Sequence, residues 1–561
     1  MTDKDLSLDP AQLHFIPMGG SEEFGTNFNL YAMEGKWLAV DCGIGFADWK
    51  LPGVDILLPD PSFLAARRDA LSALIVTHAH EDHVGAVAYL WPRLRCPIYC
   101  TPYTAAVLRQ KFEEFPACRK AQINVVKPGD TVQAGPFAVR FVHVTHSIPD
   151  ATSLIIETKA GRVVHSGDWN NDPTPVVNGP IDSDSLIEAG KKGVMAYIGD
   201  STNALTPGRS GSEGDVAAGL DALMTDTPEG RILFTVFATN IGRIQSIARA
   251  AKKHGRFVTL AGRSLRNHTE AARSCGYLAD IAPFVNEEDL TALPRHKQVI
   301  IAAGSQGQYN SALAKIVRGD HRRLKVSDGD LFVFSSRVIP GNERAIFDMT
   351  NLLSAAGVRI FTPHRSPYKI HVSGHPCRDE IADMLGWVRP KSVVTVHGER
   401  AMLERQAQLA RESGADHVVV PQNGSVVRLG PDTPAIIGQV ETGVLAVEPK
   451  RLLPADHAGI VQRRKIQFTG AAHVSVVLDE RGELLDDPQL TVLGLTDPAV
   501  SEDIAFEEDI LAEIEDVLAD MKRADREDDR AVHEKIRIAV RRMILARLGF
   551  KSVVTVHVMR G

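Results

Sequence analysis

Four candidate metal ligands lie within six residues of this sequence, in the segment HAHEDH at 78–83; they are His78, His80, Asp82 and His83. Neutral imidazoles and carboxylates are ligands that zinc accepts. An apolar run that predicts a buried strand precedes the segment, and a helical pattern follows it. In an extended turn His78 and His80 point to one side, while Asp82 and His83 turn toward a neighbouring point where the helix begins. The segment therefore predicts a metal site.

More Asp and His residues follow short apolar runs elsewhere in the chain, each at the end of a predicted strand. They are Asp41, His146, Asp168, Asp200 and His397. Strand ends in α/β folds converge on one edge of the sheet, where ligand-binding groups gather. A lone residue of this kind is more often a turn former. Together with HAHEDH, these residues are expected to meet at one point.

The elements that must position these residues alternate along the first 200 residues as short strands, turns and helices. Between about 206 and 365 the pattern becomes βαβ-like, which predicts a doubly wound unit inserted before the strand-end residues resume. After about 450, two strands, two amphipathic helices and a final strand predict a ββααβ module. KSVVTVH occurs at 391–397 and again at 551–557, and we interpret the second copy as a similar strand with His557 structural.

Composition limits the class of protein. The chain has 561 residues, of which 44% are hydrophobic, so a large core can form. Its 63 Lys and Arg residues against 70 Asp and Glu residues give a net charge of −7, which argues against a purely electrostatic nucleic-acid binder. We expect no membrane span and no export signal. Six Cys residues without paired spacing predict reduced thiols in a cytoplasmic protein.

HAHEDH with Asp41, His146 and Asp168 resembles the pattern of the metallo-β-lactamase superfamily. The resemblance implies an αββα sandwich with metals at the sheet edge. It also implies that His78, His80 and His146 bind one metal, that Asp82 and His83 bind a second, and that Asp168 bridges both. Asp41 would support the ligand loop, as metal ligands generally require.

Three later motifs resemble the nucleic-acid-processing β-CASP branch of that superfamily, and ribonuclease J within it. They are Asp200 in GDST, His375 in VSGHP and His397 in TVHGE. The resemblance implies that His397 completes the second metal site. Two departures from the family pattern are Gly242, where a histidine is expected, and GTN at 25–27 in place of GKN.

The resemblance also implies a division of the chain. Residues 1–205 would form the first part of the metallo-β-lactamase domain, 206–365 the β-CASP domain, and 366–448 the completing segment. Residues 449–561 would form a linker and the C-terminal domain. The expected fold is thus an α/β metallo-β-lactamase sandwich with an inserted doubly wound β-CASP domain and a small α+β C-terminal domain.

Two divalent metals about 3.5–4 Å apart suit phosphodiester hydrolysis. We expect two Zn²⁺ ions, with Mn²⁺ or Mg²⁺ as alternative activating metals. His375 is the candidate general acid for the leaving oxygen, and phosphate binding without proton transfer is its alternative. Asp200 is expected to orient His375 or the attacking water, and a structural role for its carboxylate is the alternative. Asp82 is counted with them as a catalytic candidate.

HVSGHPC at 371–377 also predicts a phosphate site, with Pro376 at the first position of a helix whose free N–H groups would bind phosphate. The expected phosphate-binding residues are His371, Ser373, Gly374, His375 and Ser305. For Ser305, in a Gly-rich turn, an ordinary β–α connection is the better interpretation. In the resembled family this pocket holds a 5′-monophosphate, which implies 5′→3′ exonuclease action.

The resulting hypothesis is a two-metal ribonuclease with exonuclease and endonuclease activity in mRNA decay and rRNA maturation, acting on single-stranded RNA. Basic residues at 315–325, with Arg365 and Lys369, are candidates for the RNA track. The C-terminal domain would make a homodimer or homotetramer, and RNA-degradation or ribosome-associated proteins are expected partners. The alternatives are a non-nuclease hydrolase of the same fold and an inactive RNA-binding scaffold.

Overall fold

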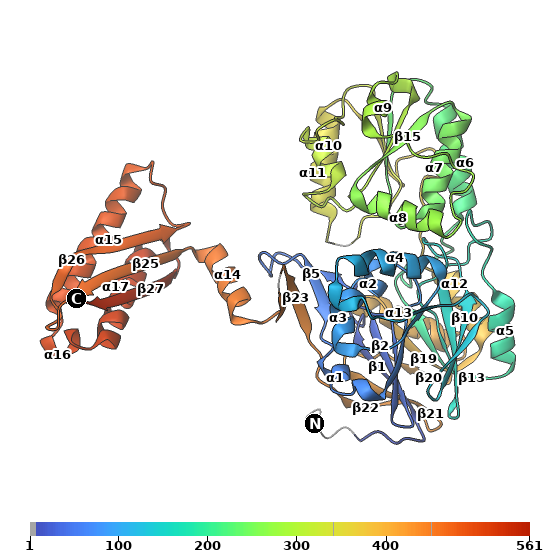
Figure 1. Cartoon of the computed structure of the whole chain (residues 1–561), viewed down its shortest axis with the longest axis horizontal. Coiled ribbons are helices and arrows are strands. Elements are labelled where there is room, and N and C mark those ends of the chain that lie inside the picture. Colours follow the sequence, from blue (N-terminus) through green and yellow to red (C-terminus); the bar gives the residue numbers. More distant parts are fainter. Residues whose placement is uncertain (1–6, 340, 450) are drawn as a thin grey trace. The chain divides into compact units, whose positions relative to one another are not determined.

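The computed structural model describes residues 7–339, 341–449 and 451–561, which divide into two compact units. The first unit comprises the described residues up to Gly45 together with Leu57–Val444, and the second comprises Phe46–Ile56 and the described residues of 445–561. Figure 1 shows the layered sheets of the first unit and the smaller sheet of the second. None of the helices in these ranges has the length and apolar character needed to span a membrane.

The first unit contains an eight-stranded sheet with the order β22-β21-β1-β2-β3-β6-β7-β8. Its strands are β22 (Ala435–Gln439), β21 (Ser425–Gly430), β1 (Leu13–Gly19), β2 (Phe28–Met33), β3 (Lys36–Val40), β6 (Leu71–Ile75), β7 (Ile98–Cys100) and β8 (Ile123–Val125). Strands β3, β6, β7 and β8 run parallel. Their carboxyl ends therefore lie at one edge, where Asp41 and the HAHEDH segment follow.

A second sheet of seven strands has the order β20-β19-β13-β12-β11-β10-β9. Its strands are β20 (His417–Val419), β19 (Pro390–Val396), β13 (Val194–Asp200), β12 (Gly161–His165), β11 (Thr152–Thr158), β10 (Phe137–His143) and β9 (Thr131–Ala134). β12, β13, β19 and β20 are parallel, and β10 runs in the same direction because it and β12 are both antiparallel to β11. His146, Asp168, Asp200 and His397 thus lie at one edge.

The two sheets pack face to face. Phe15, Tyr31 and Leu38 of the first sheet share a buried cluster with Phe141 and Ile198 of the second. Helices cover the outer faces (Figure 1), and burial of each apolar stripe drives this layering. They are α1 (Ser62–Ala65), α2 (Glu81–Val84), α3 (Val87–Leu94) and α4 (Pro102–Glu113) near the first sheet, and α5 (Ser183–Lys191), α12 (Arg378–Val388) and α13 (Arg400–Glu412) near the second.

The insertion between β13 and α12 is a five-stranded parallel sheet with helices on both faces. The strand order is β15 (Phe257–Ala261), β16 (Gln298–Ala302), β14 (Ile232–Thr235), β17 (Leu331–Phe334) and β18 (Arg359–Phe361). The main helices are α6 (Glu213–Thr225), α7 (Ile241–Lys253), α8 (Arg263–Ser274), α9 (Glu287–Thr291), α10 (Ala312–Arg318) and α11 (Glu343–Ala355). Separate apolar clusters lie on its two faces. This is the predicted doubly wound unit.

The second unit contains a three-stranded sheet ordered β26 (Leu484–Leu493), β25 (Ala471–Leu478) and β27 (Val553–Arg560). Helices α15 (Ser501–Asp520) and α17 (Asp529–Leu548) pack on one face through a cluster that includes Ile510, Ile514, Ile536 and Val540. The other elements of this unit include the hairpin of β23 (Val444–Glu448) with β24 (Arg451–Pro454), and the helices α14 (Ala458–Thr469) and α16 (Arg523–Arg526). The predicted fold class is confirmed, and the predicted ββααβ order of the C-terminal domain is found.

Candidate metal and hydrolytic centre

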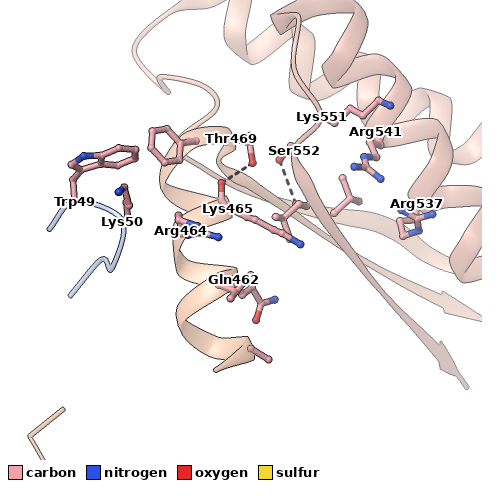
Figure 2. A pocket seen from close by; sticks show the side chains of 15 residues that line it. Trp49, Lys50, Gln462, Arg464, Lys465, Thr469, Arg537, Arg541, Lys551 and Ser552 are labelled. Carbon is pink, nitrogen blue, oxygen red and sulfur yellow. Dashed lines mark hydrogen bonds between the residues drawn. The ribbon is translucent and has the colours of Figure 1, made fainter. Parts of the chain in front are cut away.

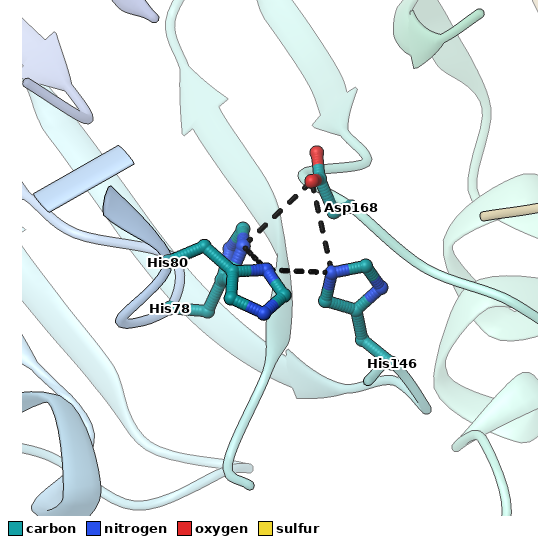
Figure 3. A group of neighbouring side chains, drawn as sticks. All are labelled: His78, His80, His146 and Asp168. Carbon is teal, nitrogen blue, oxygen red and sulfur yellow. Dashed lines mark hydrogen bonds and ion pairs between the residues drawn. The ribbon is translucent and has the colours of Figure 1, made fainter. Parts of the chain in front are cut away.

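Three histidines and one aspartate form a first group of potential metal ligands, shown in Figure 3. His80 Nδ1 lies 3.1 Å from His78 Nε2 and 3.0 Å from His146 Nε2. Asp168 Oδ2 is 3.7 Å from both His78 Nε2 and His146 Nε2. The ligand atoms of all four residues lie within 4.8 Å of one another. Such a set of nitrogen and oxygen atoms matches the ligands that zinc prefers.

Asp82, His83, Asp168 and His397 form a second group within the same distance limit. His83 Nε2 lies 3.2 Å from Asp168 Oδ2, and His397 Nε2 lies 3.4 Å from Asp168 Oδ1. The two oxygens of Asp168 thus face different histidines, and Asp168 belongs to both groups. The expected ligands, 319 residues apart at their extremes (397 − 78), are brought together, and their division between two metal ions stays a prediction.

The HAHEDH segment reaches both groups because it turns from β6 into the short helix α2. His80 is extended and forms the N-cap of α2, so Asp82 and His83 lie in the first helical turn. The loop that follows β3 packs closely against this turn, since a Cβ on Gly43 would meet Asp82 O at 1.6 Å. Cys42 N also donates to His83 O at 2.7 Å. Glycine is therefore required at position 43.

Asp41, the residue expected to support the ligand loop, is hydrogen-bonded to that loop. Its Oδ2 lies 2.8 Å from His83 Nδ1, and its Oδ1 accepts from Thr77 N at 2.8 Å. Thr77 Oγ1 in turn lies 3.0 Å from His78 Nδ1. Asp41 has a φ of +63°, in the left-handed region that a short polar side chain tolerates. One carboxylate therefore orients a ligand from each group.

Asn27 is a supporting residue that sequence reasoning missed. Its Oδ1 lies 2.9 Å from His397 Nδ1, and its Nδ2 lies 3.2 Å from His83 Nε2. Asn27 is buried, at 3% exposure. The sequence drew attention to GTN only through Thr26, whose hydroxyl donates to Glu23 at 2.8 Å. The functional signal in that motif was the asparagine next to it.

Burial and neighbouring charges divide the histidines by protonation. Burial lowers the pKa of His78 and His80 well below the ordinary value and that of His146 to about 4, so their lone pairs are free. Burial alone would lower the pKa of His397, but Asp168 raises it to about 9. Burial would raise the pKa of Asp168, but His397 and His83 hold it well below its usual range. A bound cation would compete with the protons on these groups.

His375 lies beside the cluster and is bound to Asp200. His375 Nδ1 is 2.9 Å from Asp200 Oδ2, while Asp200 Oδ1 accepts from Thr202 N at 2.9 Å. Burial would lower the pKa of His375, but the Asp200 carboxylate raises it. Asp168, Asp200, His375 and His397 also place a ligand atom each within 4.8 Å of one another. Asp200 therefore favours the protonated form of an imidazole that lies next to the candidate metal site.

The expected phosphate-binding residues of the 371–375 loop lie next to this centre. Ser373 Oγ accepts from Asn203 Nδ2 at 2.8 Å, and His146 Nδ1 lies 2.6 Å from Gly374 O. A Cβ on Gly374 would meet Ser147 Oγ at 2.7 Å and His146 at 2.8 Å, so this close approach needs glycine. His371 Nε2 is buried and has no hydrogen-bond partner among the described residues.

The predicted helix start after this loop is wrong. α12 begins at Arg378 with Cys377 as N-cap, so Pro376 precedes the cap and is not the first helical residue. The N–H groups of the helix start are already bonded: Cys377 N donates to Glu380 Oε2 at 2.8 Å, Arg378 N to Thr206 O at 3.1 Å and Asp379 N to Gly208 O at 3.2 Å. A phosphate in this loop would therefore depend on side chains and on loop backbone.

Ser305 lies on the insertion, in the turn after β16, and a chain of hydrogen bonds connects that turn to Ser373. Gln306 Nε2 donates to Arg337 O at 2.8 Å, and Arg337 Nη1 donates to Asn203 Oδ1 at 2.5 Å. Asn203 then donates to Ser373. Sequence reasoning did not find Arg337 or Asn203.

Two residues of the expected RNA track are paired with acids. Arg318 Nε lies 2.9 Å from Asp320 Oδ2, and Arg323 Nη1 lies 3.0 Å from Glu288 Oε2. Gly242 lies in the first turn of α7, where the nearest atoms to a Cβ would be side-chain atoms of Val177, Asn240 and Val176 at 3.4, 3.7 and 3.9 Å. A side chain at 242 would thus begin without a clash.

Comparison with known proteins matches four parts of the chain to described families. They are "Beta-lactamase superfamily domain" over 36–182, "Ribonuclease J, beta-CASP domain" over 229–353, "Zn-dependent metallo-hydrolase RNA specificity domain" over 367–421 and "Ribonuclease J C-terminal domain" over 459–561. The matches follow one another in the order of the observed sandwich, insertion, completing segment and second unit.

Two relatives extend this similarity along the chain. The chain is 41% identical to ribonuclease J of Sinorhizobium meliloti over 99% of its own length and 98% of that protein. It is 34% identical to ribonuclease J of Corynebacterium glutamicum over 87% of its own length and 68% of that protein. A solved Enterococcus faecalis protein of unknown function shares the fold over 74% of this chain and 100% of that chain, with a TM-score of 0.54 and 15% identity.

Proposed function

Because the chain belongs to the ribonuclease J family, we propose that it is a 5′→3′ exoribonuclease that prefers 5′-monophosphate ends and also cuts internally. The proposed roles are mRNA decay and rRNA maturation. A ribonuclease of the metallo-β-lactamase superfamily is the general conclusion that the relatives support. The observation that carries the finer proposal is the pair of ligand groups sharing Asp168, with the His375–Asp200 pair beside them.

We assign two Zn²⁺ ions to the centre, with Mn²⁺ or Mg²⁺ as alternative activating metals. His78, His80 and His146 would hold one, Asp82, His83 and His397 the other, and Asp168 both. Two divalent metals supply a nucleophilic water at neutral pH and offset charge on the phosphate. The mixed histidine and carboxylate donors fit zinc better than they fit Mg²⁺, which prefers oxygen ligands.

His375 is assigned as the group that gives a proton to the leaving 3′ oxygen. Since its Nδ1 faces Asp200 Oδ2, Nε2 is the ring nitrogen left to donate. The Asp200 carboxylate raises the pKa of the imidazole and orients the ring, and Thr202 fixes that carboxylate through its N–H and hydroxyl. Asp200 is thus a positioning residue in this proposal.

The phosphate pocket is assigned to His371, Ser373, Gly374 and His375, with Ser305 as a contributor from the insertion. The Ser373 hydroxyl is held by Asn203, and Asn170 Nδ2 donates to Ser373 O at 2.9 Å. These contacts support a rigid loop beside the cluster. A terminal phosphate bound there would place the first phosphodiester bond at the metals and favour removal of nucleotides from the 5′ end.

The predicted division at 205, 365 and 448 remains a prediction, since the compact units separate only the C-terminal part with Phe46–Ile56 from the remainder. We further propose self-association through the C-terminal domain, cytoplasmic action, and contacts with RNA-degradation or ribosome-associated proteins. Family membership supports these assignments.

The test uses one RNA sequence bearing a 5′-monophosphate, triphosphate or hydroxyl, with products resolved by size and metal content measured on the purified chain. We expect mononucleotides from the monophosphate end and two metals per chain. Asp82→Ala should abolish cleavage, whereas Asp184→Ala, at an exposed position, should not. Inactivity on every RNA with metals bound would indicate another hydrolase activity, and inactivity with less than one metal would indicate a scaffold.

The phosphate pocket has its own test. Ser373→Ala should reduce exonuclease action more than internal cleavage, because only the former needs the 5′ end to be bound. Equal loss of both activities would mean that no separate 5′-phosphate pocket exists in the 371–375 loop.

A further inference from the structure

The second unit contains a hollow of about 980 Å³ at the edge of its sheet. It lies between α14, α17, the start of β27 and the loop that carries Trp49 (Figure 2). Small-molecule sites span roughly 300–1,000 Å³, so this hollow has room for more than one base and its phosphate. Six of the fifteen lining residues are basic and none is acidic. The basic ones are Lys50, Arg464, Lys465, Arg537, Arg541 and Lys551.

Four of these cations have, in the part of the chain that the structure describes, no partner that would neutralise them. The side chains of Arg464, Lys465, Arg541 and Lys551 form no ion pair or hydrogen bond with a described residue, whereas Arg537 pairs with Glu534. Arg541 Nε is in addition buried without a hydrogen-bond partner. A buried donor of a charged group is costly when left unpaired, so this position favours an anionic acceptor.

Two exposed aromatic rings stand at the rim of the hollow. Trp49 is 64% exposed and Phe468 59%, and their ring centres are 5.9 Å apart in an edge-to-face arrangement. Figure 2 shows Trp49 on its loop facing α14, and Arg464 and Lys465 on that helix. Exposed aromatic faces beside a row of cations are how proteins bind single-stranded nucleic acid, because bases stack and phosphates pair.

Charge is segregated within this unit. α15 carries nine Asp and Glu residues and no Lys or Arg, and it packs near β26 at one edge of the sheet. The hollow lies at the other edge, along β27 and α17. A polyanion would be repelled from the β26 side and attracted to the β27 side. The segregation also explains how a chain with a net charge of −7 can present a basic site.

We propose that this hollow is a second binding site for single-stranded RNA. Arg464, Lys465, Arg541 and Lys551 bind successive phosphates, and Trp49 and Phe468 stack with bases. The inference rests on the proposed function, that the chain acts on RNA, and adds an anchoring site made of residues outside the His–Asp cluster. A second copy of the chain would bring like charges together at this face, unless it presented its acidic α15.

The test measures binding of a phosphorothioate-linked RNA, which resists cleavage, to the full-length chain at several salt concentrations. The pocket variant combines Arg464→Gln, Lys465→Gln and Arg541→Gln. Its matched control combines Lys522→Gln, Arg530→Gln and Lys535→Gln, three exposed cations of the same unit outside the hollow. Three lost phosphate contacts should reduce the slope of log K against log salt by about 2, with binding weakened about 10-fold or more.

Wild-type protein supplies a second readout that requires no variant. Photocrosslinking with 4-thiouridine RNA should label peptides that contain Trp49 or Phe468. The pocket variant should also raise KM for a long RNA while leaving cleavage of a five-nucleotide RNA unchanged, because the short RNA needs only the hydrolytic centre.

Several results would overturn the inference. Equal salt slopes for the pocket and control variants would do so, as would a failure of the RNA to label either peptide. So would a pocket variant that changes its oligomeric mass on light scattering but keeps its RNA affinity, or one that loses binding to phosphatidylglycerol vesicles but not to RNA. If the wild-type chain failed to cleave the short RNA, the proposed function would fail, whereas RNA affinity of the hollow would still be measured independently.

Discussion

The heptapeptide KSVVTVH occurs twice and has two different structural outcomes. In the copy at 391–397, β19 ends at Val396 and His397 turns to a φ of +56°, buried at 5% exposure within reach of Asp168. In the copy at 551–557, β27 continues to Arg560, and His557 is an exposed residue inside the strand, with its ring 4.3 Å from that of His473.

The residue directly after each heptapeptide accounts for this difference. Gly398 has a φ of +154° and forms isolated bridges with Ser21 and Glu23, and His397 N donates to Gly20 O at 2.8 Å. Val558, its counterpart, simply extends β27. An identical strand therefore places a histidine in the site only where the chain can leave the sheet and where carboxylates lie at the edge. The role of the histidine thus depends on the residues around the motif.

The largest contrast is expected from removing each histidine. His397→Ala should reduce RNA cleavage by at least about 100-fold, since loss of a group that merely supports a metal ligand already costs roughly 10–100-fold. His557→Ala should leave the rate unchanged. Initial rates on a 5′-monophosphate RNA, with zinc content measured for both variants, would check this. Similar rates for the two variants would contradict the assignment of His397.

Exchanging the residue after the heptapeptide should have the next largest effect. Gly398→Val places a β-branched residue at a φ that favours glycine, with its Cβ 3.3 Å from Met402 Cβ, at a strain of about 1–3 kcal/mol. Displacement of His397 by about 1 Å could lower the cleavage rate about 100-fold. Val558→Gly is the mirror control and should affect only thermal stability. Full activity of Gly398→Val would show that the turn does not position His397.

The neighbour of each histidine gives a smaller contrast. Asn27→Ala removes the acceptor at 2.9 Å from His397 Nδ1, and about 10-fold lower activity with weaker zinc retention is expected. His473→Ala removes the ring that faces His557 and should change neither quantity. Zinc loss during dialysis against a chelator, followed over time, measures the difference. Equal zinc retention in wild type and Asn27→Ala would indicate that Asn27 serves only the fold.

Asp41, the HAHEDH residues, Asp168 and His397 each follow a strand that is visible as an apolar run, so their meeting at one edge could be predicted. Asp41, Asp168 and His397 needed only the rule that strand ends converge. Asn27 was not predictable in this way, since its bond to His397 joins residues 370 positions apart, and no local pattern distinguishes it.

The residue at which the helix after the 371–377 loop begins could not be predicted from the sequence either. Pro376 suggested a helix start, but Glu380 accepts from both Cys377 N and Ser210 N at 2.8 Å, and this buried carboxylate sets the helix start two residues later. The hollow of the second unit depends on a loop from 46–56 packing with α14. Sequence reasoning divided the chain into consecutive segments, whereas this contact joins two segments that are far apart in the sequence.

The smallest effect on activity is expected from replacing His268, which lies outside both copies of the heptapeptide and outside the His–Asp cluster. Its Nδ1 is 3.0 Å from Tyr103 Oη, and burial lowers its pKa to about 4. The unfolded chain binds this proton near pH 6.5 and the folded chain only near 4, so stability is lost as the pH falls through that window. The difference corresponds to roughly 3 kcal/mol.

His268→Gln should therefore flatten part of the decline in unfolding free energy between pH 6.5 and 4, while cleavage at pH 7.5 stays unchanged. Tyr103→Phe is the matched variant, because it removes the hydrogen bond and keeps the burial that causes the shift. Thermal unfolding measured at several pH values separates the two. If Tyr103→Phe flattened the curve and His268→Gln did not, the hydrogen bond would have a larger effect on the His268 pKa than burial has. The two heptapeptides indicate that the whole surroundings of a histidine decide what it does. That result would mean that a single partner can decide it instead.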